Sequence, residues 1–313
     1  MSHLLNVVWG ALAAWFFVGL FLGIARRRGW GQTVRKDGPQ THLVKQGTPT
    51  MGGAPFVVAL LFVWIFNYLQ SGIGVVKPQE VVLILSIVLM GIIGLIDDYM
   101  IVRAKLTGAA ERGGLMARYK IALQITVGLA FGIAAARLAH PTTVDWVFWW
   151  DLIFNTFVMV GAVNAFNFTD GVDGLCAGVT LIIILPLLGA SPVVAIMAGC
   201  IIGYLWYNWK PASIFMGDVG SHALGALAAG AYVLYDHTWL LPIAGIVPVM
   251  EILSVSLQVA YFRQTGGKRI FKMTPIHHHF ELSGWQEGKV AGRFFAITAV
   301  FTALAWGLFG KGQ

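Results

Sequence analysis

Residues 80–98 read EVVLILSIVLMGIIGLIDD, an apolar block that ends in two adjacent carboxylates, Asp97 and Asp98. About 20 apolar residues at a rise of 1.5 Å per residue span the roughly 30 Å hydrocarbon core of a bilayer. Carboxylates at that depth are costly unless they bind a cation or line a wet cavity. The stretch therefore predicts a membrane-spanning helix that carries chemistry at one end.

The composition of the whole chain agrees with a membrane protein. Of its 313 residues, 58% are hydrophobic and only 11% are charged, whereas about 25% are charged in a soluble domain. So few charges cannot coat a water-exposed surface of this size. The two cysteines, Cys176 and Cys200, lie in apolar blocks and are expected to be small core residues without a disulfide.

Similar apolar blocks recur along the chain, and they predict an all-α polytopic membrane protein with about ten transmembrane helices. No soluble domain or sequence repeat is evident, so we expect residues 1–313 to form a single integral-membrane domain. The first block is long, and its arginines follow it, so we expect a retained helix and no cleaved signal. The candidate spans are about 4–24, 54–70, 80–98, 120–139, 146–165, 175–190, 192–209, 221–236, 239–262 and 290–309.

The basic residues predict the orientation of these spans. Lys and Arg in short loops favour the cytoplasmic side, and eighteen of the 21 fall on the side reached after the first span. Both termini are then periplasmic, and the net charge of +7 describes an inner membrane face and gives no reason to expect a nucleic-acid partner. The three on the other side are Lys77, Arg137 and Lys311. The eighteen are Arg26, Arg27, Arg28, Arg35, Lys36, Lys45, Arg103, Lys105, Arg112, Arg118, Lys120, Lys210, Arg263, Lys268, Arg269, Lys272, Lys289 and Arg293.

Five polar segments stand out, and this orientation places all five on the cytoplasmic side. Because the orientation came from basic residues alone, the coincidence independently supports an active-site cleft on that face. The segments are 45–53 (KQGTPTMGG), 97–99 (DDY), 164–174 (NAFNFTDGVDG), Asn208 with 215–221 (FMGDVGS), and 273–281 (MTPIHHHFE).

The segment that starts at Lys45 combines glycines, hydroxyls and a positive charge. Such a loop can offer backbone N–H groups to a phosphate at a helix start; the alternative is an ordinary loop with a helix-capping threonine.

The carboxylates predict a divalent cation. Neighbouring helix positions differ by about 100°, so Asp97 and Asp98 can face one cleft only near a helix end. Asp218 adds a carboxylate from a different helix, and oxygen ligands without cysteine favour Mg²⁺ or Mn²⁺ over Zn²⁺. The alternatives are a water-facing pair for the first two and a helix N-cap for Asp218.

Segment 164–174 cannot act from one continuous helix, because Asn164 and Asp173 would then point in opposite directions. Its glycines predict a break that lets Asp170 and Asp173 fold back into the site. Amide, hydroxyl and carboxylate groups, Asn164 and Asn167 among them, suit hydrogen bonds to uracil and ribose or support of a metal ligand. A purely structural turn is the alternative.

The three consecutive histidines, His277, His278 and His279, cannot share one helical face. We expect a loop that offers one or two imidazoles to a diphosphate, and we do not expect a zinc pair. Glu251, deep in the ninth block, is expected to be protonated or paired and to have a structural role. Gln258 lies close enough to the cytoplasmic mouth to contact the site.

Taken together in this order, the five motifs resemble the MraY family, the phospho-N-acetylmuramoyl-pentapeptide transferases of the polyprenyl-phosphate N-acetylhexosamine-1-phosphate transferase superfamily. The resemblance runs from about Gly31 to Phe295. It implies that UDP-N-acetylmuramoyl-pentapeptide and undecaprenyl phosphate give lipid I and UMP, the first membrane step of peptidoglycan synthesis. It also implies a requirement for Mg²⁺, a homodimer and a place in the bacterial cytoplasmic membrane.

The resemblance also implies roles for single residues. Those essential to catalysis would be Asp97, Asp98, Asp218 and His277, with Asp218 a metal ligand. The nucleotide-sugar pocket would include Lys45, Thr50, Lys120, Asp170, Asp173, Phe215 and Gln258, with Asn208 beside the catalytic residues. In one departure, Ile101 stands where many members carry lysine, so that one basic contact of the cleft is either missing or supplied by Arg103 or Lys105; in another, the loop 107–114 is longer than usual.

Two mechanisms and two rival functions fit these residues. Asp98 attacks the β-phosphate in one mechanism; in the other, which we favour, the lipid phosphate attacks directly, because a phosphomonoester is mostly a dianion at neutral pH. The nearer rival function is a sister transferase that uses UDP-N-acetylglucosamine. The other is an ion-coupled transporter, which predicts mid-membrane charges and inverted repeats.

Overall fold

The computed structural model describes residues 2–31, 45–70, 76–108 and 113–309, and these residues are almost entirely helical. The basic residues Arg35, Lys36, Arg112 and Lys311 and part of the loop 107–114 lie outside the described residues. The α-helices are α1 (His3–Arg28), α2 (Gly53–Gln70), α3 (Pro78–Leu106), α4 (Ala117–Ala139), α5 (Trp146–Thr169), α6 (Leu175–Ile184), α7 (Pro192–Asn208), α8 (Gly217–Leu234), α9 (Leu241–Ala244), α10 (Ile246–Gln264), α11 (Ile276–Glu281) and α12 (Glu287–Phe309).

Seven of the described helices are long and apolar enough to cross a membrane, namely α1, α2, α3, α4, α5, α10 and α12. Helices α6 and α7 are apolar but shorter, and α8 is apolar after His222. Each of the ten predicted blocks contains a helix, and the chain is an all-α, multi-pass membrane protein, as predicted.

Helix α8 forms the centre of the bundle, and nearly all of its residues after the first turn are buried. It packs against α3 and α5, while α4 packs on α5, and α1 packs on α7 at the far edge. A glycine permits the approach of α3 to α8, since a Cβ at Gly94 would collide with the backbone of Asp218. This contact brings the carboxylates of α3 to the first turn of α8.

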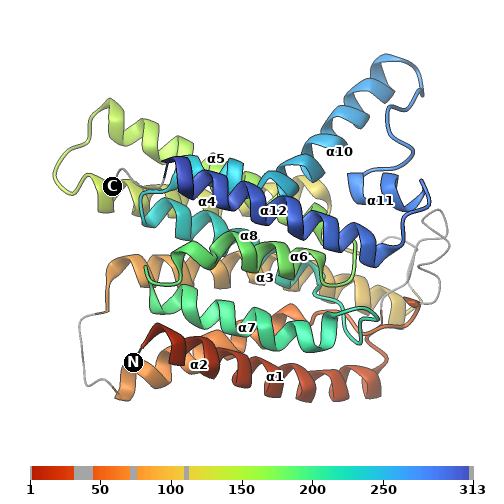
Figure 1. Cartoon of the computed structure of the whole chain (residues 1–313), viewed down its shortest axis with the longest axis horizontal. Coiled ribbons are helices and arrows are strands. Elements are labelled where there is room, and N and C mark those ends of the chain that lie inside the picture. Colours follow the sequence, from red (N-terminus) through yellow and green to blue (C-terminus); the bar gives the residue numbers. More distant parts are fainter. Residues whose placement is uncertain (1, 32–44, 71–75, 109–112, 310–313) are drawn as a thin grey trace.

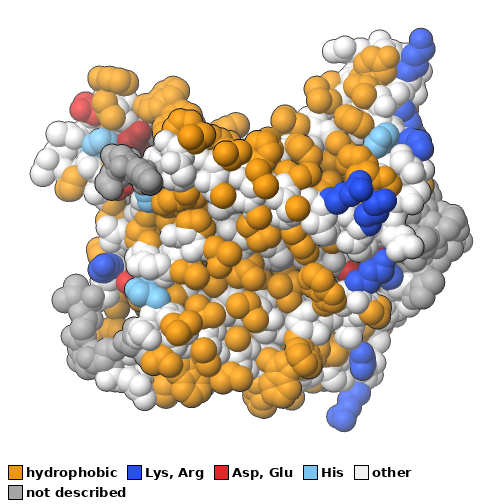
Figure 2. Space-filling view, in the orientation of Figure 1, with side chains coloured by type: hydrophobic (Ala, Val, Ile, Leu, Met, Phe, Trp, Pro, Cys, Tyr) orange, Lys and Arg blue, Asp and Glu red, His pale blue; other side chains and the backbone are white. Residues whose placement is uncertain are grey.

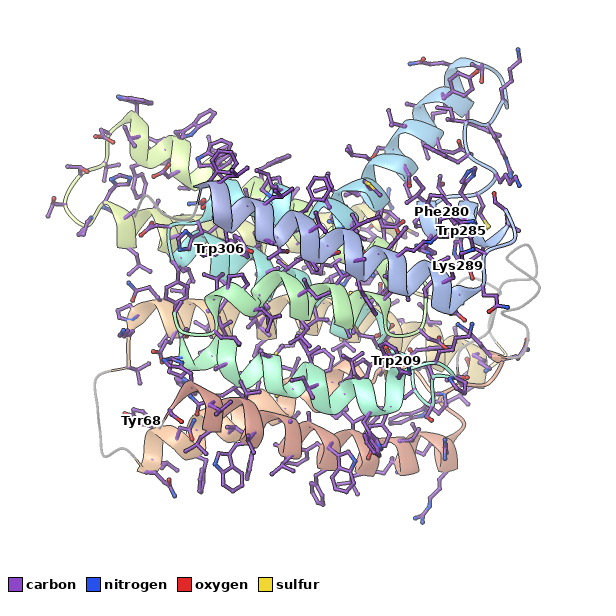
Figure 3. The ribbon with its side chains drawn as sticks, viewed as in Figure 1. Tyr68, Trp209, Phe280, Trp285, Lys289 and Trp306 are labelled. Carbon is purple, nitrogen blue, oxygen red and sulfur yellow. The ribbon has the colours of Figure 1, made fainter. Side chains whose placement is uncertain are left out.

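The two ends of the bundle differ in charge. The start of α1 and the end of α12 lie at one end, whereas α11 and the basic end of α10 lie at the other (Figure 1). Lys and Arg side chains gather at the α11 end, and few face the opposite end (Figure 2). The α11 end is therefore the cytoplasmic one by the distribution of basic residues. The labelled Trp209, Trp285 and Lys289 lie toward it, and Tyr68 and Trp306 toward the opposite end (Figure 3).

Three predicted boundaries are wrong. Helix α3 does not end at the carboxylates but runs on to Leu106. The ninth span is interrupted at Gly245, which separates α9 from α10; Pro242 and Pro248 lie three residues to either side and lack the N–H that a continuous helix uses. The sixth span becomes a 3-10 turn at Leu185–Leu187, which contains Pro186.

The predicted histidine loop is also wrong in part, because residues 276–281 form the short helix α11 after Pro275. The predicted break in segment 164–174 is confirmed. Helix α5 ends at Thr169, and α6 begins at Leu175 after Gly174, which has a left-handed φ of 73°. The turn 170–174 between them lies at the cytoplasmic end.

Candidate active site

Carboxylates from α3 and α8 meet a lysine from α4 at the cytoplasmic end. Lys120 Nζ lies 3.0 Å from Asp97 Oδ2 and forms a second ion pair with Asp218. Asp97 Oδ1 also accepts a hydrogen bond of 2.6 Å from the Leu115 N–H. We call Asp97, Asp98, Lys120 and Asp218 the acidic cluster. A single ammonium bridges two of its three carboxylates.

Asp98 faces a different partner from Asp97. Its two oxygens accept hydrogen bonds of 3.1 Å from the backbone N–H groups of Asp218 and Val219. Asp98 thus caps the first turn of α8, where unpaired N–H groups favour a negative charge. The two aspartates have different hydrogen-bond partners, Lys120 of α4 for Asp97 and the first turn of α8 for Asp98, although Asp218 lies close to both.

Asn167 joins the acidic cluster from α5. Its Nδ2 donates to Asp218 Oδ1 at 2.9 Å and to Ser221 Oγ at 3.0 Å. The Asp218 side chain is 27% exposed, the most open carboxylate of the acidic cluster. It is therefore positioned to bind a cation while Asn167 holds one of its oxygens.

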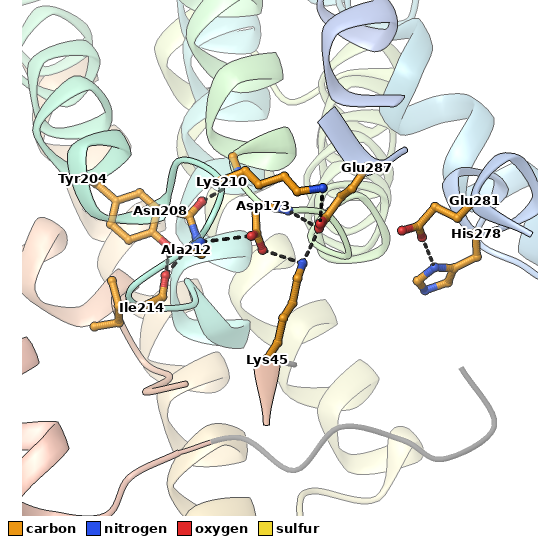
Figure 4. A network of polar contacts seen from close by, with 11 residues as sticks. Lys45, Asp173, Tyr204, Asn208, Lys210, Ala212, Ile214, His278, Glu281 and Glu287 are labelled. Atoms are coloured by element: carbon orange, nitrogen blue, oxygen red, sulfur yellow. Dashed lines mark hydrogen bonds and ion pairs between the residues drawn. The ribbon is translucent and has the colours of Figure 1, made fainter. Parts of the chain in front are cut away.

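A second group of charges lies beside the turn 170–174, and Figure 4 shows its contacts. Lys45 Nζ lies 2.7 Å from Asp173 Oδ1 and pairs with Glu287 at the start of α12. Glu287 also pairs with Lys210 at 3.1 Å and accepts a bond from the Asp173 N–H at 3.1 Å. We call Lys45, Asp173, Lys210 and Glu287 the lysine cluster. Its four charges balance in the absence of a ligand.

The loop that carries Lys45 is attached to the segment before α8. The N–H of Phe215 donates to the Pro49 carbonyl at 2.8 Å, and the Gly52 N–H donates to the Phe215 carbonyl at 2.9 Å. Lys45 Nζ lies 5.9 Å from the centre of the Phe215 ring. Thr50 is buried, and a Cβ at Gly217 would contact its hydroxyl. These contacts place the predicted phosphate loop between the two clusters.

Asn208 holds the turn and the neighbouring loop together. Its Oδ1 accepts from the Gly174 N–H at 3.0 Å, and its Nδ2 donates to the Ile214 carbonyl at 2.9 Å. The side chain is buried, and both polar atoms are used by the backbone. The structure therefore gives it a bracing position next to the site.

Asp170 occupies the start of the turn. Burial raises the pKa of its carboxyl to about 7, and the negative charges of Asp218 and Asp173 act in the same direction. At neutral pH this carboxyl is therefore close to half protonated, unlike an ordinary aspartate.

His277 reaches the same turn from α11. A Cβ at Gly171 would collide with its Nε2, so the imidazole lies directly against the glycine backbone. Its Nδ1 lies 3.0 Å from Glu251 Oε1, and the exposed fractions of the two side chains are 1% and 0%. The Nε2 atom is buried and has no hydrogen-bond partner among the described residues. Glu251 is thus paired, as we expected, and it fixes the direction in which the imidazole points.

Four predicted site residues form hydrogen bonds with partners that belong to neither cluster. His278 Nδ1 lies 2.8 Å from Glu281, and His279 Nδ1 accepts from the Lys272 N–H at 3.1 Å. Gln258 closes the loop after α10, with its Oε1 accepting from the Ile270 and Phe271 N–H groups. The fourth, Asn164, donates to Gln124 Oε1 and to the Val160 carbonyl, deeper in the bundle. Lys105, one of the two residues considered as a substitute for the lysine absent at position 101, donates a hydrogen bond to the Gly31 carbonyl.

Sequence reasoning missed Lys210, Glu287 and the orienting contact of Glu251. An acidic residue at the basic start of the last apolar block was the only local signal for Glu287. Both carboxylates pair with residues far away in the chain, so no local spacing could identify them.

Comparison with known proteins identifies the family of the chain. A family profile described as Glycosyl transferase family 4 matches residues 81–236, which include the acidic cluster and the turn 170–174. A phospho-N-acetylmuramoyl-pentapeptide-transferase of Deinococcus radiodurans is 49% identical over 97% of this chain and 99% of the relative. That of Deinococcus deserti is 52% identical over 96% and 97% of the two chains, and that of Listeria innocua is 39% identical over 90% of each. At this identity over nearly the whole length, the chain belongs to the phospho-N-acetylmuramoyl-pentapeptide transferase (MraY) family.

Proposed function

We propose that this chain transfers phospho-N-acetylmuramoyl-pentapeptide from its UDP carrier to undecaprenyl phosphate, giving lipid I and UMP. We further propose that its 313 residues form one transferase domain and that it acts as a homodimer. The observation that carries the proposal is the meeting of the acidic cluster, the lysine cluster and His277 around one turn, residues 170–174, at the basic end of the bundle. Phosphoryl transfer needs positioning and neutralisation of charge above all, and these groups suit both.

The acidic cluster fits Mg²⁺. No group of three or more His, Cys, Asp or Glu side chains forms a closed cage in the described part of the chain. Mg²⁺ does not need one, because it binds to one or two carboxylates and completes its shell with water and phosphate oxygens. Asp218 would hold the ion, with Asp97 as its neighbour and Asn167 as support. When bound, the ion supplies positive charge to the phosphate oxygens.

The lysine cluster would take the donor. Lys45 would exchange its carboxylate partners for diphosphate oxygens, and Thr50 and Phe215 flank the place where Lys45 points. Asp173 and Asp170 lie on the turn beside it and suit hydrogen bonds to the sugar hydroxyls. Lys120 would neutralise phosphate charge on the side of the acidic cluster. His278 and His279 are further donor-binding candidates from α11.

The geometry favours direct attack over a covalent enzyme intermediate. An oxygen of the lipid phosphate would attack the β-phosphorus, the bond from that phosphorus to the bridging oxygen would break, and UMP would leave with the electron pair. Asp98 makes a poor nucleophile, because both of its oxygens accept hydrogen bonds from the first turn of α8. Trapping of a phosphorylated enzyme with donor alone would contradict this mechanism.

The lipid acceptor would reach the site from the side. Helix α10 leans away from the bundle (Figure 1), and its Leu253 and Leu257 are 52% and 55% exposed. On the facing helix α5, Ile153 and Phe157 are 63% and 71% exposed. These apolar side chains would contact the polyprenyl tail while its phosphate stays at headgroup depth.

The test is UMP release by purified protein in detergent with undecaprenyl phosphate and Mg²⁺. UDP-N-acetylmuramoyl-pentapeptide and UDP-N-acetylglucosamine are supplied in separate reactions. Asp218→Ala and EDTA should abolish release, whereas Asp151→Ala, at a carboxylate paired with His140 on the opposite face, should not. Release from the second donor alone would assign the chain to the sister activity. Release from neither, by folded protein, would contradict the proposal and favour a test of ion transport.

A further inference from the structure

A second polar layer lies one helical turn deeper than the acidic cluster. Asn164 Nδ2 on α5 donates to Gln124 Oε1 on α4 at 2.8 Å, and Gln124 Nε2 lies 2.9 Å from His222 Nε2 on α8. Gln124 and His222 are both 0% exposed. We call Asn164, Gln124 and His222 the deep triad; its members come from three different helices.

The direction of every hydrogen bond in the deep triad is fixed from one end. Asn164 also donates to the Val160 carbonyl at 2.8 Å, and a carbonyl can only accept. Asn164 therefore presents its NH₂ group to Gln124, whose oxygen accepts. Gln124 in turn presents its own NH₂ to His222, so His222 Nε2 accepts and the ring proton lies on Nδ1. No member can rotate without losing a bond.

The deep triad joins the same three helices that meet at Lys120, Asp218 and Asn167. Gln124 lies one turn beyond Lys120 on α4, and His222 lies one turn beyond Asp218 on α8. Asn164 lies one turn deeper than Asn167 on α5. The same three helices thus meet twice, first through Lys120, Asp218 and Asn167, and again through the deep triad.

A layer of leucines would hold three helices together equally well, but it would tolerate rotation and sliding. Buried amide and imidazole groups do not, because a polar group that loses its partner there pays a desolvation penalty. A shift of one residue along any of the three helices would turn the side chain by about 100° and break the bonds. Polar layers of this kind can set the register of packed helices.

We propose that Gln124, His222 and Asn164 are positioning residues, which set the register of α4, α5 and α8 so that Lys120, Asn167 and Asp218 converge. The inference rests on the proposed transferase function. It reassigns Asn164 from a substrate contact to this deeper layer, and it gives roles to two residues outside the sequence motifs. A misplacement of about 1 Å in reacting groups costs about 100-fold in rate, so loss of register should be seen mainly in kcat.

The experiment compares His222→Leu, which removes the acceptor, with His222→Gln, which keeps one in a side chain of similar size. Gln124→Met removes the partner and leaves His222 in place. Thr298→Val is the matched control, since Thr298 is 0% exposed and donates only to the Phe294 carbonyl of its own helix. The measurements are kcat and KM for each substrate in UMP release, and the rise in unfolding temperature on adding Mg²⁺.

We expect His222→Leu and Gln124→Met to lower kcat at least about tenfold with KM changed less than about threefold. His222→Gln should stay within about threefold of wild type, and Thr298→Val should be unaffected. His222→Leu should also lose the Mg²⁺-dependent rise in unfolding temperature. Equal kcat in the two His222 variants, or a loss no greater than that of Thr298→Val, would overturn the inference.

Failure of the proposed function would look different. Wild-type protein would then release no UMP from either donor, and the Mg²⁺ comparison would decide the inference alone. A Mg²⁺ effect on unfolding temperature that is the same in wild type and His222→Leu, present in both or absent in both, would overturn it. An effect present in wild type and His222→Gln but lost in His222→Leu would support it.

Discussion

Replacing Glu251 by glutamine tests whether the direction of the His277 imidazole matters to the reaction. The carboxylate holds His277 by two contacts, Oε1 at 3.0 Å from Nδ1 and Oε2 at 3.4 Å from the backbone N–H. Both contacts place a hydrogen-bond donor against an acceptor, since the carboxylate only accepts. A carboxylate behind an imidazole fixes its tautomer and orientation, which leaves Nε2 to act.

Glutamine has the same shape, but its amide can accept at only one of the two places. If its oxygen faces the backbone N–H, its NH₂ group meets Nδ1 and forces the ring proton onto Nε2. If its oxygen faces Nδ1, the backbone bond is lost. In the first case the bond with Nδ1 is reversed, and in the second the backbone bond is lost, so in each case His277 no longer donates to a carboxylate, a bond worth about 1.5–3 kcal/mol. At about 1.36 kcal/mol per factor of ten, the loss in kcat should be about 10- to 150-fold.

The assay is UMP release at saturating concentrations of both substrates. Glu80→Gln, at a carboxylate in the first turn of α3 on the opposite face, is the matched control and should keep kcat. The unfolding temperature should fall by only a few degrees, as expected for the loss of one buried hydrogen bond, which would show that the variant remains folded and that the loss of kcat reports the orientation of His277. A Glu251→Gln variant with kcat within twofold of wild type would refute the reasoning, because His277 would then not need its carboxylate partner.

Three further predictions concern Lys45, Asn208 and Asp170. Lys45→Met should raise KM for the donor at least about tenfold, because Lys45 contacts two carboxylates and faces the Phe215 ring. Lys210→Met is the control and should change KM less than about threefold, because it removes one ion pair of a side chain that is 43% exposed. Steady-state kinetics with both variants checks this. Asn208→Leu should lower the unfolding temperature by several degrees, because it removes two buried backbone hydrogen bonds worth about 1 kcal/mol each; thermal unfolding in detergent measures it, and an unchanged midpoint would contradict the bracing role. The folded-state pKa of Asp170 is about 7 and lies above its ordinary value of 3.8. The stability that this group contributes is therefore fully present below about pH 4 and is lost as the pH rises through 7. Asp170→Asn should therefore flatten the fall in unfolding temperature between pH 5 and 8, and equal slopes for variant and wild type would contradict the raised pKa.

The sequence by itself determined the membrane class, and it predicted the orientation and the five segments that build the candidate site. These features depend on local patterns: long apolar blocks, the one-sided distribution of Lys and Arg, and glycines inside a polar stretch. The break between α5 and α6 was predictable because Gly171 and Gly174 lie close together in a polar stretch, and a glycine such as Gly174 readily adopts a left-handed φ that does not continue a helix. The end of α3 was placed too early, because the apolar block ends at Asp98 whereas the helix continues past the two aspartates to Leu106, just before Thr107 and Gly108.

Only the tertiary structure decided which polar groups are partners. Lys45 and Glu287 are separated by 242 positions, Lys120 and Asp218 by 98, and Gln124 and His222 by 98. Each residue alone looks like an ordinary charged, amide or imidazole side chain, and its role comes from a helix that packs against it from elsewhere in the chain. Helix contacts such as that of Gly94 with Asp218 set these distances. A single sequence gives the side chains but not how the helices cross. It therefore predicts which residues could form the site but not which of them pair.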